Sequence, residues 1–295
     1  MKNNKVAIIL GFYDGYKYID EQLVSILEQT HKELTIFIFD DNSPQKFNLK
    51  NLKINYQPKK IRVINRVENL GFAKNFLYGL KEIQNDFDFY AFSDQDDIWE
   101  NNKIAIALKS LENKNLNVPT LYCNRTKYYN SDCSKEIGSS KKFNREKLFR
   151  NALLQNIAGG NTIVMNKMSK ILISNSLFSE NYVSHDWWCY QFITAAGGKI
   201  IYSNDQTLKY RQHEDNVIGM NNQLSKKVIR FKKFYSGEFK RWCDINIKNL
   251  YLNKKNITKK NLITLQYFSN ARESKNIFMK LKYFFKSGVY RQSLS

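Results

Sequence analysis

The hydrophobic positions of the chain predict short buried strands that alternate with amphipathic helices. Lys5 to Leu10 contains a continuous apolar run and is followed by Gly-Phe-Tyr-Asp-Gly, the pattern of a buried strand that opens into a loop. Ile19 to Gln29 then carries apolar residues at helical spacing, and Leu34 to Phe39 returns to the strand pattern. This strand–helix–strand order predicts parallel pairing through a right-handed crossover.

The same alternation continues further along the chain. A third strand, Ile61 to Ile64, leads into a helix at Ala73 to Leu80, and a fourth strand from Phe87 to Phe92 precedes a cluster of acids. A helix is expected to begin near Ile98 and to run through Leu108. Four strands would therefore end in polar loops at one edge of a doubly wound sheet, which is where such folds bind their ligands.

The pattern beyond this point is less regular. Strands are expected at Thr120–Cys123, Ile163–Met165, Lys199–Tyr202 and Thr207–His213, and helices at Lys147–Gln155 and His185–Ala196. A polar loop is expected from Asn130 to Asn144 and a flexible turn at Ala158–Thr162.

Charge is distributed unevenly over the 295 residues, whose net charge is +20. Residues 221–295 hold 18 Lys or Arg against 3 Asp or Glu, whereas residues 1–220 hold 29 against 24. Basic and aromatic residues mix at 224–242 and again at Ile277–Lys286. This mixture predicts amphipathic helices that lie on a membrane surface, or that pack on the core with their lysines in solvent. The sign alone does not choose between nucleic acid, an anionic membrane and a polyanionic acceptor.

Targeting signals and cysteine chemistry are not indicated. No run reaches the roughly 18 apolar residues needed to cross a bilayer, and the first residues lead into a strand rather than a cleavable signal. We therefore expect a cytoplasmic protein. The four cysteines are scattered without a Cys-x-x-Cys pair, which indicates neither a zinc site nor a disulfide framework.

Three acids, Asp94, Asp96 and Asp97, emerge directly after the fourth strand. Carboxylates so close together repel unless a divalent cation lies between them. Asp-x-Asp at a strand end offers oxygen ligands to Mg²⁺ or Mn²⁺ and leaves positions open for phosphates. The alternative is that Asp96 or Asp97 caps the next helix, but one cap does not explain three acids.

A second acidic pair, Asp40 and Asp41, follows the second strand. A carboxylate there can accept hydrogen bonds from a nucleobase or a ribose, as an acid after the second strand does in dinucleotide-binding folds. Asp-Asp-Asn-Ser is also a typical turn sequence. Because the chain has neither Gly-x-Gly-x-x-Gly nor a P-loop, diphosphate recognition would run through a metal rather than a glycine cradle.

The motifs of the chain, taken in the order in which they occur, resemble those of family 2 glycosyltransferases, particularly the bacterial rhamnosyltransferases of surface-polysaccharide assembly. The matching segments lie between about residues 5 and 219 and are Tyr13-Asp14-Gly15, Tyr18 to Leu23, Ser25 to Thr30, Asp40 to Ser43, Asn69-Leu70-Gly71 with Asn75, Phe92 to Trp99, His185 to Trp188, and Tyr210 to His213 with Asn216. The chain departs from the family pattern at Asp14, where Asn is usual, and at Asn42, where Gly is usual. Neither change removes a catalytic group.

This resemblance implies the GT-A fold, a Rossmann-like α/β fold with a mixed, mainly parallel sheet and helices on both faces. The catalytic domain would occupy residues 1–220, with a nucleotide-binding half at about 1–100 and an acceptor-binding half at about 101–220. Residues 221–295 would form a helical, basic, aromatic-rich extension.

An inverting transferase is the activity that the resemblance implies. Asp94 and Asp96 would hold Mg²⁺ or Mn²⁺ on the diphosphate of a nucleotide sugar, and the imidazole of His213 would be a third ligand. Asp186 would be the general base toward the acceptor hydroxyl. The alternatives are an N-cap role for Asp186, which opens a predicted helix, and a hydrogen-bonded structural role for His213.

The resemblance also implies two sets of binding residues. The donor-binding set is Tyr13, Glu21, Asp40, Asp41, Asn69, Asn75, Asp94, Gln95 and Arg211, in which Arg211 would reach the diphosphate with two hydrogen bonds. The acceptor-binding set is Trp187, Trp188, Gly160 and Asn161, with His185 shaping the same pocket and the turn at Gly159 and Gly160 passing close under the donor sugar. Tryptophan faces stack on sugar rings, but adjacent tryptophans on a helix point different ways, so at least one is expected in the core.

The expected activity is transfer of a sugar, with rhamnose from dTDP-rhamnose as the first candidate, to a lipopolysaccharide- or capsule-type glycan or a lipid-linked oligosaccharide. The basic tail would hold the protein on the inner face of the bacterial cytoplasmic membrane. A UDP-hexose donor stays open because uracil and thymine present the same N3–H and carbonyl edge. A nucleic-acid-binding protein would leave the acid clusters unexplained, and an inactive sugar-binding relative would have lost an acid that this chain retains.

Overall fold

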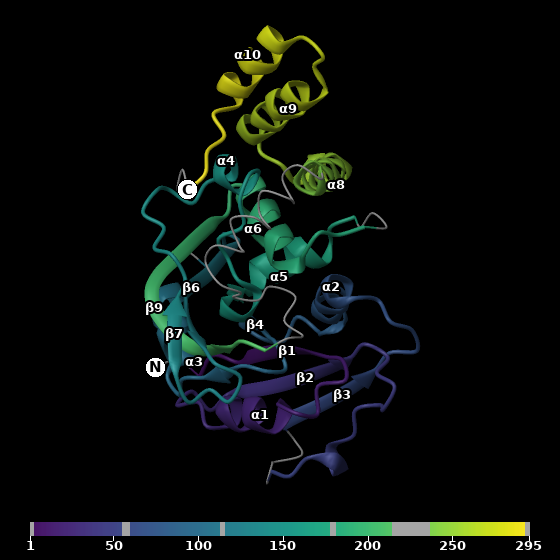
Figure 1. The fold of residues 1–295 in the computed structure, drawn as a ribbon, viewed down its shortest axis with the longest axis vertical. Coiled ribbons are helices and arrows are strands. Elements are labelled where there is room, and N and C mark those ends of the chain that lie inside the picture. The colour runs from purple at the N-terminus through teal and green to yellow at the C-terminus, as the bar shows by residue number, and fades with distance from the viewer. Residues whose placement is uncertain (1–2, 55–59, 113–115, 178–180, 214–236, 293–295) are drawn as a thin grey trace.

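The computed structural model describes residues 3–54, 60–112, 116–177, 181–213 and 237–292. Its strands are β1 (Val6–Phe12), β2 (Leu34–Asp40), β3 (Ile61–Asn65), β4 (Phe89–Ser93), β5 (Ile98–Trp99), β6 (Thr120–Tyr129), β7 (Glu136–Ser139), β8 (Val164–Asn166) and β9 (Lys199–Arg211). Over these residues the strands form one mixed sheet in the order β3-β2-β1-β4-β8-β6-β9-β5, with β7 paired to β6 (Figure 1).

The described helices include those that cover both faces of this sheet and those of the C-terminal region. They are α1 (Ile19–Leu27), α2 (Phe72–Glu82), α3 (Lys103–Glu112), α4 (Phe149–Ala152), α5 (Lys167–Ser174), α6 (His185–Ala195), α8 (Glu238–Leu252), α9 (Lys259–Glu273) and α10 (Ile277–Ser287), with short 3₁₀ turns η1 (Leu49–Asn51), η3 (Gly160–Thr162) and η4 (Lys254–Asn256). One apolar cluster joins α1 and α3 to the sheet, and a second joins α2, α5 and α6 to its other face. The GT-A-like arrangement implied by the motifs is therefore confirmed.

The first half of the sheet is parallel. Strand β1 pairs with β2 and β4, and β2 pairs with β3, all in the same direction. Ala7 and Ile9 of β1 pack in the cluster under α2, whereas Ile8 and Leu10 pack in the cluster under α1. Because both faces of β1 are buried, its sequence is a continuous apolar run rather than an alternating one.

The second half of the sheet differs from the sequence expectation in two places. Ile98 and Trp99, expected to begin a helix, form β5 and pair antiparallel with β9, so that α3 begins only at Lys103. Neither Asp96 nor Asp97 therefore caps a helix. The two strands expected at 199–202 and 207–213 are one long strand, β9, which shifts register against β6 near Asn124 and Arg125.

The C-terminal region is helical, as expected. Cys243, Ile247 and Leu250 of α8 belong to the same apolar cluster as α6, and the ring of Phe239 stacks on Trp187 with centroids 6.3 Å apart. Helices α9 and α10 lie at one end of the molecule (Figure 1). Most of the basic segment at 224–242 lies outside the described residues. Within the described helices, none is long and apolar enough to cross a membrane.

Candidate active site

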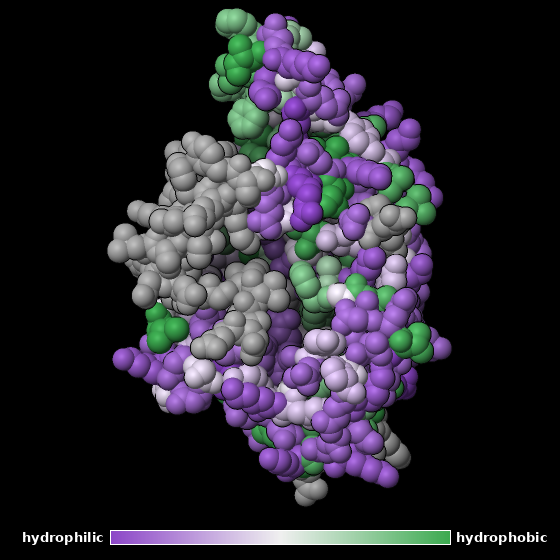
Figure 2. Space-filling model, turned by 45° about the vertical axis from the view of Figure 1, so that its right-hand side comes forward, coloured by the Kyte–Doolittle hydropathy of each residue, from purple (hydrophilic) through white to green (hydrophobic). Residues whose placement is uncertain are grey.

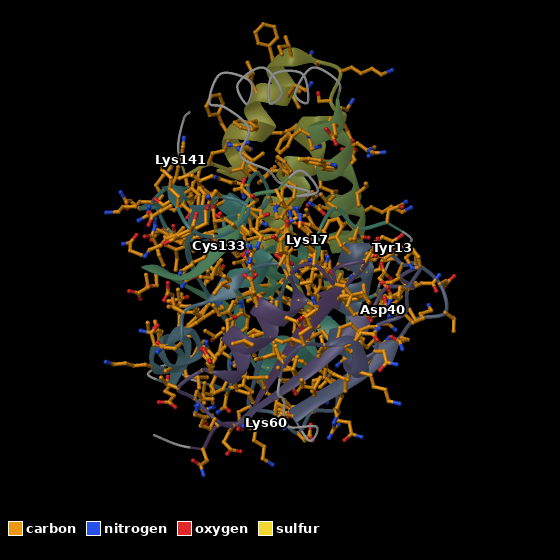
Figure 3. The ribbon with its side chains drawn as sticks, turned by 60° about the horizontal axis from the view of Figure 1, so that its bottom comes forward. Tyr13, Lys17, Asp40, Lys60, Cys133 and Lys141 are labelled. Carbon is orange, nitrogen blue, oxygen red and sulfur yellow. The ribbon has the colours of Figure 1, made fainter. Side chains whose placement is uncertain are left out.

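Polar side chains gather where the parallel strands end. Phe12, the last residue of β1, lies opposite Asp40 in the register of β2, and Leu10 lies opposite Ser93 at the end of β4. Figure 3 shows Tyr13 and Asp40 on the same side of the sheet, away from Lys60 before β3. The loops after β1, β2 and β4 therefore meet at one edge, which is the expected ligand edge of such a sheet.

Asp40 and Asp41 organise the loops around them. One oxygen of Asp40 accepts hydrogen bonds from the backbone N–H and the hydroxyl of Ser43, and the other accepts from the backbone N–H of Phe47 at 2.9 Å. Asp41 accepts from the backbone N–H of Leu70 at 2.8 Å. Both carboxylates are buried. They join the end of β2 to the two loops that follow it.

Asn69 and Asn75, both expected to contact the donor, differ in their surroundings. Asn69 is exposed, and its side-chain oxygen accepts from the backbone N–H of Gly71 at 3.0 Å. Asn75 is buried on α2, donates to the carbonyl oxygen of Phe39 at 2.8 Å and accepts from Nε of Arg66 at 3.0 Å. In this arrangement Asn75 fixes α2 against β2, and of the two residues Asn69 is the one exposed to solvent.

Tyr13 and Gln95 are joined by two hydrogen bonds. The backbone N–H of Tyr13 donates to Oε1 of Gln95 at 2.8 Å, and Nε2 of Gln95 donates to the carbonyl oxygen of Tyr13 at 3.0 Å. The Tyr13 ring remains 49% exposed. A Cβ at Gly15 would clash with the Gln95 amide, so a larger residue there would displace the side chain that bonds Tyr13.

The acid loop after β4 carries a concentrated negative charge. Burial, followed by the charges of Asp96 and Asp186, raises the pKa of Asp94 to about 7. Asp97 is fully buried and accepts from Nδ2 of Asn161 at 2.6 Å. Burial and the charges of Asp96 and Asp94 also hold the pKa of Asp97 well above its usual range. Three carboxyl groups thus share a region in which each added charge is costly.

His213 and Arg211 approach this loop from the end of β9. Nε2 of His213 lies 2.8 Å from a carboxylate oxygen of Asp96. Arg211 is only 1% exposed, and its guanidinium donates to the carbonyl oxygens of Asp96 and Ser131 and to the carboxylate of Glu21. Arg211 and Glu21, both expected to contact the donor, therefore pair with each other at 2.6 Å. Arg211 holds the acid loop through its hydrogen bond to Asp96.

Tyr18 completes this support. Its ring lies under the guanidinium of Arg211, with the guanidinium carbon 4.5 Å from the ring centroid, and its centroid is 5.0 Å from that of His213. Tyr18 stands in a family-like motif, but the sequence alone assigns it no role because its partners are far away in the chain. The aromatic face offers a cation–π contact that helps to hold Arg211 in place.

Asp186 enters the site from the first turn of α6. The N-cap of this helix is Ser184, so the N-cap alternative for Asp186 is wrong. One Asp186 carboxylate oxygen accepts from the backbone N–H of Trp187 at 2.6 Å, and its charge acts on Asp94 across the site. The helix N-terminus favours an ionised carboxylate at this position.

Trp187 and Trp188, both expected to contact the acceptor, are buried. The indole N–H of Trp187 donates to the carbonyl oxygen of Ala152 at 2.7 Å, and Trp188 stacks on Phe192 with centroids 4.9 Å apart. In this conformation neither ring presents a face to a sugar. The reason is that every residue of α6 is buried, and Phe239 of α8 stacks on Trp187.

His185 lies in a tight aromatic pocket. Its ring stacks on Phe76 with centroids 4.1 Å apart and meets the edge of Phe92 at 4.9 Å. Burial lowers the pKa of His185 to about 4. A Cβ at Gly160 would lie 2.5 Å from Nε2 of His185, so glycine at 160 makes room for the imidazole. Gly160 and Asn161 thus contact His185 and the acid loop.

Lys103, which the sequence analysis did not single out, is buried beside the acid loop. Its ammonium lies 4.6 Å from the centroid of the Trp99 ring. Burial lowers the pKa of Lys103 to about 7, and the charge of Asp97 opposes that shift. The sequence did not indicate that this lysine is buried, because Lys103 stands in an amphipathic helical pattern, where lysine normally faces solvent.

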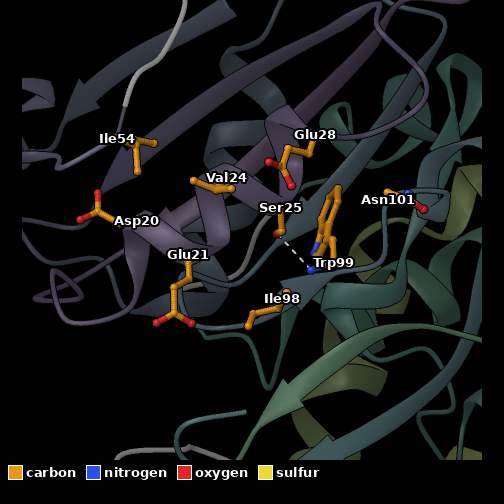
Figure 4. Close-up of a pocket in the computed structure, with 9 residues that line it drawn as sticks. All are labelled: Asp20, Glu21, Val24, Ser25, Glu28, Ile54, Ile98, Trp99 and Asn101. Atoms are coloured by element: carbon orange, nitrogen blue, oxygen red, sulfur yellow. Dashed lines mark hydrogen bonds between the residues drawn. The ribbon is translucent and has the colours of Figure 1, made fainter. Parts of the chain in front are cut away.

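A cavity of about 330 Å³ opens beside α1 and β5. Its lining is Asp20, Glu21, Val24, Ser25, Glu28, Ile54, Ile98, Trp99 and Asn101 (Figure 4). The hydroxyl of Ser25 accepts from the backbone N–H of Trp99 at 3.0 Å and joins α1 to β5. Asp94, Asp96, Asp186 and His213 do not line this cavity, so it is not the catalytic centre indicated by the acids.

The donor set suits a hard divalent cation. Asp94 and Asp96 offer carboxylate oxygens and His213 an imidazole nitrogen, and burial, followed by the charges of Asp96 and Asp186, raises the pKa of Asp94. Over the described ranges, no three His, Cys, Asp or Glu side chains converge closely enough to enclose a metal. Asp94, Asp96 and His213 are therefore not gathered as a closed three-ligand metal site in this structure.

The sequence matches that of a known protein family. Residues 7–171 match the model of glycosyl transferase family 2, and the chain belongs to that family. It is 32% identical over 232 residues to the dTDP-rhamnosyl transferase RfbG of Shigella flexneri, covering 75% of this chain and 77% of that protein. The glycosyltransferase class inferred from the motifs is confirmed.

Two solved structures share the fold at low sequence identity. The structure of S. aureus TarS in complex with UDP-GlcNAc is similar with a TM-score of 0.55 and 15% identity, covering 96% of this chain and 79% of that one. The mannosyltransferase PcManGT from Pyrobaculum calidifontis, in complex with GDP-Man and Mn²⁺, is similar with a TM-score of 0.50 and 12% identity, covering 97% and 86%. Both likenesses support the fold alone.

Proposed function

We propose that this chain is a metal-dependent, inverting glycosyltransferase that moves a sugar from a nucleotide-diphosphate donor to a hydroxyl group of a surface-glycan acceptor. The observation that carries the proposal is the placement of Asp186, in the first turn of α6, close enough to Asp94, just after β4, for its charge to add to burial and to Asp96 in raising the pKa of Asp94. Two acids supplied by different elements suit a reaction that needs a leaving-group site and a base.

Asp186 is the proposed general base. It would take the proton of the acceptor hydroxyl while that oxygen forms a bond to the anomeric carbon and the bond to the nucleotide diphosphate breaks. Attack on the face opposite the leaving group inverts the configuration of the anomeric carbon. General base catalysis of this kind is typically worth about 10²–10⁴ in rate.

Asp94, Asp96 and His213 are the proposed holders of Mg²⁺ or Mn²⁺. A bound divalent cation would supply positive charge to the diphosphate leaving group. Arg211 contributes by holding the acid loop through the carbonyl oxygen of Asp96, and Glu21 contributes by holding Arg211. This support lets the carboxylates keep one arrangement through the reaction.

The donor site is proposed to lie over the loops that carry Tyr13, Asp41 and Asn69. The exposed ring of Tyr13 offers a surface for a nucleobase to stack on, and Gln95 fixes its backbone. Asp40 and Asn75 shape the same loops from within the fold. Gly160 and Asn161, next to Asp97 and His185, would form the wall nearest to the sugar.

Rhamnose from dTDP-rhamnose is the first donor to test, because the chain is similar over three quarters of its length to a dTDP-rhamnosyl transferase. A UDP-hexose is the alternative, since thymine and uracil offer the same hydrogen-bonding edge. We further propose that the acceptor is a lipid-linked or lipopolysaccharide-type glycan and that the enzyme works at the inner face of the cytoplasmic membrane.

Nucleotide release provides the decisive experiment. The purified chain is incubated with dTDP-rhamnose or UDP-glucose and a panel of glycan acceptors, with Mn²⁺ or with EDTA, and free nucleoside diphosphate is measured. Acceptor-dependent release of dTDP that EDTA abolishes supports the proposal. Release of UDP alone would identify a UDP-hexose as the donor. Full activity in EDTA would refute the proposed metal dependence.

A further inference from the structure

Two opposite sides of helix α10 differ in their exposure. On one side Tyr283 stacks on Tyr267 of α9, with centroids 6.3 Å apart, and Ser287 is buried. On the other side five large apolar side chains are exposed, namely Ile277 (58%), Phe278 (79%), Leu281 (48%), Phe284 (40%) and Phe285 (76%). We call these five residues the outer face of α10. The packing of the protein explains the first side and leaves the outer face uncovered.

The outer face is a continuous stripe. At about 100° per residue, its five positions fall within an arc of about 120° on one side of the helix. Lys280 and Lys282 fall just beyond the two edges of this arc, one on each side, and both are exposed. A row of aliphatic and phenyl groups bordered by lysines is the pattern of helices that lie in a membrane interface.

The surrounding charge has one sign. From Ser274 to Gln292 the chain carries five Lys or Arg and no Asp or Glu. Lysine stems can extend along apolar groups and place their ammonium groups at the level of lipid phosphates. Each lysine near an anionic bilayer adds electrostatic attraction to it.

A second copy of this chain suits the outer face less well. A two-fold contact through the same face would bring Lys280 and Lys282 of one copy close to those of the other, with no acid on this helix to offset their repulsion. Nucleic acid suits it less well again, because phosphates and sugars offer no apolar surface for Ile277 or Leu281. An anionic bilayer matches both the apolar stripe and its charged borders.

The position of α10 leaves it accessible. Helices α9 and α10 form the end of the molecule opposite α1 and β3 (Figure 1). Hydrophobic side chains gather at this tip among hydrophilic ones (Figure 2). A flat membrane could therefore meet the tip without contact with the far end of the sheet.

We propose that the outer face of α10 docks on an anionic lipid bilayer, with the helix axis in the plane of the interface. The five apolar side chains enter the boundary between head groups and acyl chains, and Lys280 and Lys282 reach the phosphates on either side. This inference rests on the membrane location given in the proposed function and names the surface that docks there. The surface contributes no catalytic residue, so the inference holds for any donor sugar.

Vesicle flotation of the full chain tests the proposal. Wild-type protein should float with vesicles of phosphatidylcholine and phosphatidylglycerol and bind vesicles of phosphatidylcholine alone less tightly. The double variant Phe278→Ser/Phe285→Ser should bind the anionic vesicles at least about tenfold more weakly. Val67→Ser/Leu177→Ser, which removes two exposed apolar side chains elsewhere, should bind like the wild type.

Reversal of the border charges provides an independent measurement. Lys280→Glu/Lys282→Glu should lose anionic-vesicle binding and leave the melting temperature unchanged, because both side chains are exposed. Vesicle binding that stays at wild-type strength in both double variants would overturn the proposal. So would a concentration-dependent dimer in sedimentation that Phe278→Ser/Phe285→Ser abolishes while the wild type does not float. Transfer to a water-soluble acceptor, measured in parallel, reports on the enzymatic proposal separately.

Discussion

Nε of Arg211, at the end of β9, donates a hydrogen bond to the backbone carbonyl oxygen of Asp96 at 2.8 Å. The same guanidinium pairs with Glu21 on α1, 190 residues earlier in the chain. The last strand of the sheet thereby fixes the loop after β4 against the first helix. The buried guanidinium thus ties the acid loop to two other parts of the fold, Ser131 and Glu21.

Arg211→Lys should impair transfer although it preserves charge. Lysine cannot donate in the planar fork that reaches Asp96, Ser131 and Glu21 together. We expect kcat/KM to fall by roughly tenfold to a hundredfold, because a small displacement of the acid loop misplaces the reacting groups. Steady-state kinetics measures the effect, and Lys209→Arg on the same strand is the control. Wild-type kinetics in Arg211→Lys would show that the fork is dispensable.

Asp186→Asn should separate chemistry from binding. The amide keeps the shape of the side chain but cannot accept a proton from the acceptor, so kcat should fall by about 10²–10⁴. The dissociation constant of the nucleotide, measured by calorimetry, should change little. Asp205→Asn, which alters an exposed acid of β9, should leave both quantities unchanged. A loss of nucleotide affinity equal to the loss in rate would argue for a binding role instead.

The parallel half of the sheet could be predicted from the sequence because its strands are continuous apolar runs that end in polar loops. The predicted run at Leu34 to Phe39 matches β2 to within one residue. Strand β5 could not be predicted, since Ile98 and Trp99 are extended only through pairing with Leu208 and Lys209, more than a hundred residues later. The strand propensity of two residues does not indicate whether such a distant partner exists.

The candidate site shows the same division. Motif order brought together Asp94, Asp96 and Asp186 because each stands at the end of a strand or the start of a helix. The pairing of Glu21 with Arg211 could not be predicted, because only the fold reveals that these two side chains, far apart in the sequence, meet each other. Trp187 stacks on Phe239 of α8, and no spacing rule predicts that α8 packs there.

Cation affinity should depend on pH through Asp94. Its pKa of about 7 in the protein without a cation means that a proton competes for the same oxygens. The dissociation constant for Mn²⁺, measured by calorimetry with a bound nucleoside diphosphate, should therefore rise as pH falls below about 7 and approach a tenfold change per pH unit. Asp94→Asn should bind Mn²⁺ weakly and with a flatter pH dependence. Equal wild-type affinity at about pH 6 and about pH 8 would exclude Asp94 as a ligand.

His185 should make the stability of the fold depend on pH. Its pKa is lowered to about 4 in the folded protein, whereas an unfolded chain protonates histidine near about 6.5. Between these values the unfolded state binds more protons, so the free energy of unfolding rises with pH and is lost as pH falls from about 6.5 toward about 4. The contribution amounts to about 3 kcal/mol at most.

The variant His185→Gln isolates this contribution, because it removes the titrating ring from the pocket formed by Phe76, Phe92 and Gly160. The difference in unfolding free energy between wild type and variant, measured by urea denaturation, should favour the wild type most near neutral pH and shrink on acidification. His31→Gln, a half-buried histidine near the start of β2, is the control and should not reproduce this trend. A difference that stays constant with pH would mean that His185 takes up its proton in the folded protein, and that the aromatic pocket does not keep the imidazole neutral beside Asp186.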